Sequence, residues 1–298
     1  MPAPDAVWRA PTSDSGKFFC VRRRFSRGAI TIAVIVIVLA VAITAGVYVL
    51  LQRAKPFVAG ENCQVTTPRG SLTLEIEQAE IAATIAAVAE RRRLPQRAVV
   101  IAYATALQES KMLNLPFGDR DSVGIFQQRP SQGWGTPKQL LDPVYATRKF
   151  FAALVEVENY QKMPLHEAAQ AVQRSADGTA YAQHEEDAKI LAAAFTGRVP
   201  KALHCWFPPP KDSEQAEPRT DRARKELVRA LGNTAFSDGK ISARSTRRGW
   251  LIAAWSVAHA QRYGLRTVRY QGLVWSAEDG HAGWVEDPEA TARHVRLT

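Results

Sequence analysis

The chain has 298 residues, 46% of them hydrophobic, and a formal net charge of +10. This length exceeds one small domain and suits two modest domains with an additional segment. The positive charge would attract polyanionic wall polymers or acidic headgroups, although such charge can also serve solubility alone. No basic helix or aromatic platform motif is present, so we expect no nucleic-acid partner.

The first predicted element is a membrane-spanning helix at residues 29–51. These 23 residues carry no charge, and about 20 apolar residues suffice to cross a bilayer as a helix. Residues 1–28, which we expect to be disordered, hold six Lys and Arg side chains, whereas only Arg53 and Lys55 directly follow the span. This asymmetry predicts a single-pass protein of the cell membrane, with a cytoplasmic N-terminus and an extracellular bulk. The alternative is a cleaved signal peptide, whose apolar segment would be shorter, about 7–15 residues.

Two of the three cysteines, Cys63 and Cys205, lie beyond the span. They form the only possible pair on the outer side, where a disulfide persists, whereas Cys20 is expected to stay reduced. Because the closed loop is long, the bridge would stabilise the fold by roughly 4–5 kcal/mol on the chain-entropy model. Two buried free thiols are the alternative. No close Cys/His spacing indicates a metal site, apart from the adjacent pair His204 and Cys205.

Residues 52–70 are predicted to be a linker, and residues 71–205 a nearly all-helical domain. A helix is expected to begin near Thr73, and a second one spans Arg97–Ser110 with an apolar face. No alternating strand pattern stands before Cys205. Further helices are expected over four segments: Thr136–Leu141, Pro143–Val155, Pro164–Arg174 and Tyr181–Phe195.

A proline-rich spacer at residues 206–220 leads into a predicted small α/β domain at residues 221–298. Its expected elements are a helix and three strands: Ser245–Tyr263, Thr267–Tyr270, Leu273–Trp275 and a strand near Gly283–Val285. This domain has no assigned chemistry, and an envelope protein partner is its expected ligand. In another interpretation it carries the main activity and the helical domain only docks it to the wall. Its polar side chains match no metal-ligand spacing: His259, Asp279, His281 and His294.

One acid, Glu109, ends the apolar helix Arg97–Ser110 and precedes a polar loop. Burial beside apolar residues keeps a carboxylic acid neutral, which is what the protonation of a glycosidic leaving group requires. The alternative is a solvated acid at a helix end, paired with Lys111 or Arg120. The chemistry alone therefore permits a glycosidase and does not require one.

The pair Glu109–Ser110, followed by Ser122-Val123-Gly124-Ile125-Phe126-Gln127, resembles the first two motifs of soluble lytic transglycosylases and goose-type lysozymes. In those families a Glu-Ser pair precedes a Gly-Leu-Met-Gln-like segment. The resemblance covers about residues 72–203. It implies a mainly α, lysozyme-like fold, peptidoglycan strands as the substrate, and Glu109 as the general acid and then base. We expect no cofactor.

The third motif of the family, Ala-Tyr-Asn-x-Gly, is absent as such, and Gln173 with Tyr181 downstream stands in its place. This departure leaves open a non-catalytic lysozyme-like scaffold that binds glycan or an envelope partner. A transglycosylase, as the resemblance implies, uses the 6-hydroxyl of the sugar and needs no second acid. An inverting hydrolase needs another carboxylate about 6.5–9.5 Å away, for which Asp121 ranks above Asp119.

The predicted substrate-binding residues surround this acid in sequence or in the family pattern. Each also has a plain structural interpretation, as a cap, a loop-ordering amide, a loop anchor or a core residue. They are Ser110, Ser122, Gly124, Gln127, Trp134, Gln173 and Tyr181.

Overall fold

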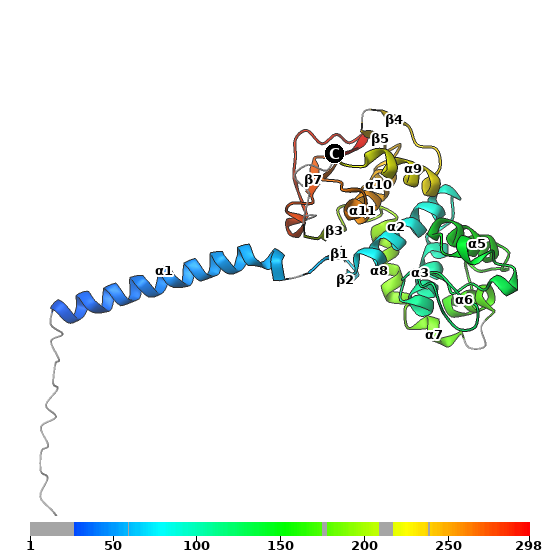
Figure 1. Cartoon of the computed structure of the whole chain (residues 1–298), viewed down its shortest axis with the longest axis horizontal. Helices are drawn as coiled ribbons and strands as arrows, with labels where there is room; N and C mark the ends of the chain where they lie inside the picture. The colour runs from blue at the N-terminus through cyan, green and yellow to red at the C-terminus, as the bar shows by residue number, and fades with distance from the viewer. Residues whose placement is uncertain (1–26, 59, 175–177, 209–216, 238) are drawn as a thin grey trace, which may run out of the picture. The chain divides into compact units, whose positions relative to one another are not determined.

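The computed structural model describes residues 27–58, 60–174, 178–208, 217–237 and 239–298. The expected disordered tail lies almost wholly outside these residues, as does much of the proline-rich spacer. The chain divides into two compact units, Met1–Ala54 and Lys55–Thr298. Helix α1 (Arg27–Val58) includes the segment predicted to span the membrane (Figure 1). In the described part of the chain, no helix combines the length and the apolar character that a membrane crossing needs.

A small antiparallel sheet with the order β2-β1-β3 begins the second unit. Its strands are β1 (Asn62–Thr67), β2 (Gly70–Leu74) and β3 (Leu203–Trp206). The expectation that no strand precedes Cys205 is therefore wrong. So is the expected helix start near Thr73, because helix α2 begins at Ile76 after a capping box formed by Glu75 and Gln78.

This sheet explains the disulfide. Cys63 on β1 lies directly opposite Cys205 on β3, and the two fully buried side chains are bonded to each other. The predicted pairing is thus confirmed, and it joins residues 142 positions apart in sequence. The bridge ties the start of the helical part to its end.

The helical part of the second unit lies between β2 and β3 in sequence and is built around α2 (Ile76–Arg91), which buries most of its residues. Helix α2 contacts other helices of this part and also helices of the C-terminal half of the unit, which follows β3. Helix α5 has the predicted bounds. The predicted helix Tyr181–Phe195 is divided in two because the chain turns at Gln183 and His184. The other helices are α3 (Gln96–Ser110), α4 (Pro137–Leu140), α5 (Pro143–Val155), α6 (Leu165–Gln173), α7 (Thr179–Ala182) and α8 (Glu185–Phe195).

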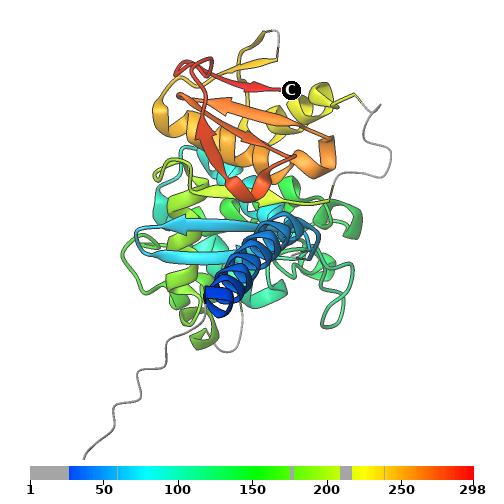
Figure 2. The same cartoon turned by 90° about the vertical axis from the view of Figure 1, so that its left-hand side faces the viewer.

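A second antiparallel sheet follows, with six strands in the order β4-β5-β9-β6-β7-β8 (Figure 2). Helix α10 (Thr246–Ala258) packs against β6 and β9. The strands are β4 (Phe236–Ser237), β5 (Lys240–Ser242), β6 (Thr267–Tyr270), β7 (Leu273–Ser276), β8 (Trp284–Glu286) and β9 (His294–Leu297). The remaining helices are α9 (Thr220–Leu231) and α11 (Ala260–Tyr263), so the expected helix Ser245–Tyr263 is interrupted at His259. The chain therefore combines helices with antiparallel sheets.

Both halves of the second unit contribute to one hydrophobic core. Helix α10 contacts α2 and β3. The indole N–H of Trp275 donates to the Cys205 carbonyl at 3.1 Å, and that of Trp284 donates to the Leu203 carbonyl at 2.7 Å. Strand β3 is thus held by two tryptophans of the C-terminal half as well as by the disulfide. The two predicted domains are therefore in contact through α10, β3 and these tryptophans.

Candidate active site

Helix α3 carries Glu109, and burial fixes the helix in place. The hydroxyl of Tyr103, fully buried, donates to the Ala82 carbonyl on α2 at 2.8 Å. Burial raises the pKa of Tyr103 well above its usual range, so the hydroxyl keeps its proton. The helix ends because Lys111 adopts a left-handed conformation, with φ 54°. The position of Glu109, half-buried in the last turn, is therefore well determined.

Side chains from α6 and α7, 64 and 72 positions further along the chain, contact the Glu109 carboxylate. The Tyr181 hydroxyl on α7 donates to Glu109 Oε1 at 2.6 Å. The Gln173 amide at the end of α6 donates to the same oxygen at 3.0 Å and to the Phe126 carbonyl at 2.8 Å. In the described part of the chain, no hydrogen bond or ion pair occupies Oε2 of Glu109. Two predicted residues are thus placed in direct contact with the predicted acid.

The turn at Gly124 follows the loop that holds Asp121 and precedes Phe126, whose carbonyl accepts from Gln173. Gly124 has φ 80°, and an added Cβ would lie 2.5 Å from the Leu140 carbonyl oxygen, so the turn requires glycine. The Gln127 amide donates to the Gly124 carbonyl at 3.1 Å, and its oxygen accepts from the Ser122 hydroxyl at 3.0 Å. The Ser110 hydroxyl donates to the Ile125 carbonyl at 2.9 Å. These predicted substrate-binding residues contact one another and the turn, and they hold it beside the end of α3.

Asp121, the predicted second carboxylate, has other partners. Its Oδ1 accepts from Arg129 Nε at 2.8 Å and from the Ser131 hydroxyl at 3.0 Å, and its Oδ2 accepts from the Ser131 N–H at 2.7 Å. The hydrogen bond from the Arg129 guanidinium, with that from the Ser131 N–H, holds the pKa of Asp121 well below its usual range. Within the described residues, no hydrogen bond joins Asp121 to Glu109.

Two other candidates lie apart from this cluster. Asp119 is exposed, and its Oδ2 lies 3.9 Å from Arg120 Nε in a loose surface ion pair. Trp134 is half-buried, and its carbonyl accepts from the Tyr145 hydroxyl at 3.3 Å. Neither contact reaches Glu109.

The structure adds a polar group that the sequence did not single out. Gln108, the residue before Glu109, accepts through Oε1 from the Gln183 amide at 3.1 Å and lies 3.0 Å from His184 Nε2. Burial lowers the pKa of His184, which favours the neutral ring. Because an amide oxygen only accepts hydrogen bonds, the contact with Gln108 Oε1 requires the ring proton on Nε2. In the sequence, only the position of Gln108 next to Glu109 could have indicated this group, because its partners Gln183 and His184 lie about 75 residues further along.

Comparison of the chain with models of known protein families and with curated proteins found no match. The chemical interpretation of the site therefore depends on its geometry and on the resemblance described above.

Proposed function

We propose that this chain is a membrane-anchored enzyme that cleaves the glycan strand of peptidoglycan, with Glu109 as the general acid and then the general base. The contacts of Glu109 carry this proposal. Tyr181 and Gln173 fix its Oε1, so a proton on the neutral acid resides on Oε2. That oxygen has no partner in the described part of the chain and can deliver the proton to a glycosidic oxygen.

The surroundings of Asp121 favour the transglycosylase route over an inverting hydrolase. The base of an inverting enzyme must hold and deprotonate a water molecule. Both Asp121 oxygens already accept hydrogen bonds, and Arg129 lowers the basicity of the carboxylate. Attack by the 6-hydroxyl of the substrate needs no such base. Glu109 alone would then protonate the leaving group and afterwards accept the proton of that hydroxyl.

Two features support an extracellular location with an anchor. Residues 29–51 form an uncharged apolar stretch preceded by a basic segment, and the described large apolar side chains of α1, from Ile32 to Val49, are exposed. The Cys63–Cys205 disulfide is suited to an oxidising compartment. In this proposal helices α2–α8 form the lysozyme-like domain, and residues 221–298 bind an envelope partner.

The decisive test uses the full-length chain in a non-ionic detergent with purified peptidoglycan, and identifies the products by mass. Anhydro-muramyl ends would support the transglycosylase, whereas reducing ends would identify a hydrolase. The Glu109→Gln variant should release neither product. Glu158→Gln, a matched change at an exposed acid, should behave as the parent.

Release of products by Glu109→Gln at the parental rate would overturn the assignment of Glu109. If the parent releases no product yet sediments with peptidoglycan as Glu109→Gln does, the chain is the non-catalytic scaffold instead. The same preparation therefore separates the two functions.

A further inference from the structure

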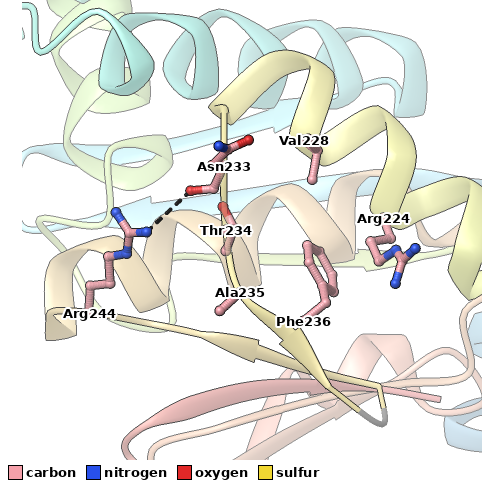
Figure 3. Close-up of a pocket in the computed structure, with 7 residues that line it drawn as sticks. All are labelled: Arg224, Val228, Asn233, Thr234, Ala235, Phe236 and Arg244. Atoms are coloured by element: carbon pink, nitrogen blue, oxygen red, sulfur yellow. Dashed lines mark hydrogen bonds between the residues drawn. The ribbon is translucent and has the colours of Figure 1, made fainter.

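A pocket of about 440 Å³ lies between helix α9 and the segment that leads into β4, in the C-terminal half of the second unit (Figure 3). It is remote in sequence from Glu109 and its partners. Two arginines and five uncharged residues line it: Arg224, Val228, Asn233, Thr234, Ala235, Phe236 and Arg244. No acidic side chain is among these seven described residues, which together carry a net positive charge.

The two arginines come from different elements and lie on opposite sides of the 233–236 segment (Figure 3). Arg224 is exposed on α9, and Arg244 is exposed in the turn before α10. In the described part of the chain, neither forms an ion pair with a carboxylate. Arg244 donates one hydrogen bond, to the Asn233 carbonyl at 3.4 Å, which leaves most of its five N–H groups for a ligand.

Three neighbouring arginines on α9 and α10 form ion pairs with acids. Arg229 on α9 pairs with Asp142 and Glu226. Arg247 and Arg248 on α10 both pair with Glu90, at 2.7 and 3.6 Å. Arg224 and Arg244 differ from these neighbours, because neither forms an ion pair with a carboxylate of the described residues.

The floor of the pocket is apolar and partly aromatic. The Phe236 ring and the Val228 side chain are both half-buried, so each still presents some apolar surface. The Arg224 guanidinium carbon lies over the Phe236 ring, 5.5 Å from its centre, in a cation–π contact. A ligand that meets Arg224 would therefore also meet Phe236.

The backbone holds Arg244 in a fixed position. Its φ is 59°, in the left-handed region that favours glycine. Its neighbours are secured on both sides, since the Ala243 N–H donates to the Arg293 carbonyl at 3.0 Å and the Ser245 hydroxyl caps α10. These contacts hold the backbone of Arg244 at the edge of the pocket.

From these observations we infer that the pocket binds an oxyanion, a carboxylate or a phosphate, attached to an apolar group. Guanidinium groups match both anions through paired N–H donors. The anion would contact Arg224, and the apolar group would cover Phe236 and Val228. Arg244, on the other side of the 233–236 segment, would add to the positive potential of the pocket. This site is independent of the glycosidase proposal, because it uses none of the residues around Glu109.

The test is calorimetric titration of the full-length chain in a non-ionic detergent with four probes. They are N-acetylphenylalanine, its neutral amide, phenyl phosphate and inorganic phosphate. At least one of the two aromatic anions should bind about tenfold or more tightly than both the neutral amide and inorganic phosphate. The relative affinity of carboxylate and phosphate then identifies the oxyanion.

Arg224→Gln should weaken that binding about tenfold, and Arg244→Gln should weaken it by a smaller factor. Arg222→Gln is the matched control, because it removes the same charge from α9 at a position that does not line the pocket. All three changes are at exposed residues, so unchanged melting temperatures verify folding. The inference is overturned if neither aromatic anion binds, if the neutral amide binds equally well, or if the two pocket variants match Arg222→Gln.

Discussion

Glu109 and Asp121 lie twelve positions apart in one stretch of sequence, and the structure surrounds them differently. Glu109 ends a buried helix and accepts two hydrogen bonds on one oxygen, while the other oxygen is open in the described part of the chain. Asp121 lies in a loop, and both its oxygens accept bonds from Arg129 or Ser131. A carboxylate bonded on both oxygens orders its loop, whereas one with an open oxygen remains able to transfer a proton.

The largest effect expected from this difference is on catalysis. Glu109→Gln keeps the size and the polar contacts of the side chain but cannot donate a carboxylic proton. Product release from peptidoglycan should fall by about 10²–10⁴-fold, the usual contribution of a general acid. Asp121→Asn should keep the rate within a few-fold. Both rates are measured by mass analysis of released muropeptides.

The opposite result would reverse the comparison. If Asp121→Asn loses as much activity as Glu109→Gln while its fold is retained, Asp121 is the second carboxylate of a hydrolase. Reducing ends in place of anhydro ends should then appear among the products of the parent chain.

The second effect concerns the turn at Gly124, which lies beside the end of α3. Gly124→Ala would combine a left-handed φ with a Cβ 2.5 Å from the Leu140 carbonyl, and should lower the free energy of unfolding by about 2–4 kcal/mol. Gly133→Ala has a similar φ, 78°, and open space around the added carbon. It should cost only about 1–2 kcal/mol. Denaturant unfolding of both variants measures the difference, and equal losses would show that the close approach contributes nothing.

The third prediction tests whether the hydrogen bond from Tyr181 to Glu109 Oε1 orients the carboxylate. Tyr181→Phe removes the 2.6 Å hydrogen bond to Oε1, so kcat should fall about tenfold with little change in KM. Tyr145→Phe is the matched control, because its hydroxyl bonds to the Trp134 carbonyl away from Glu109. A loss of activity shared by both variants would indicate a general effect on stability instead of the orientation of Glu109.

Part of this site is predictable from sequence. The position of Glu109 at a helix end follows from the apolar periodicity of α3, and the family pattern directs attention to Gln173 and Tyr181. Their contacts with Glu109 join residues 64 and 72 positions apart, which no local pattern specifies. The bonds of Asp121 to Arg129 and Ser131 form within an irregular loop, where spacing carries no periodic signal.

The fold shows the same limit. Helix α5 and strand β6 begin and end where proline, Asp capping and β-branched residues predict. The hairpin of strands β1 and β2 was missed although its pairing is local, whereas the pairing of β1 with β3 joins residues some 140 positions apart. Helix α9 was missed because its buried residues, such as Ala223 and Leu227, stand among charged ones. The sequence predicts elements with a clear apolar pattern and clear end signals, such as α5, and it does not predict the short hairpin, the highly charged helix or the pairing across the chain.

The smallest effect is on the stability that Asp121 gives to its loop. Arg129 and Ser131 hold its pKa below the unfolded value of about 3.9. The contribution of the ionised group is therefore present above about pH 4 and is lost as the pH falls through the folded pKa. Since the side chain is 37% exposed, solvent screens the Arg129 pair and the effect should be small.

Asp121→Asn should thus melt at a lower temperature than the parent at about pH 7 and pH 5, and the difference should shrink at about pH 3. Asp119→Asn removes an acid from the same loop that has only a loose contact with Arg120, so its melting temperature should follow the parent throughout. A difference for Asp121→Asn that grows on acidification would mean that this acid is stabilised in its neutral form. In that case Asp121 resembles a proton donor more than Glu109 does, and the roles of the two carboxylates would have to be exchanged.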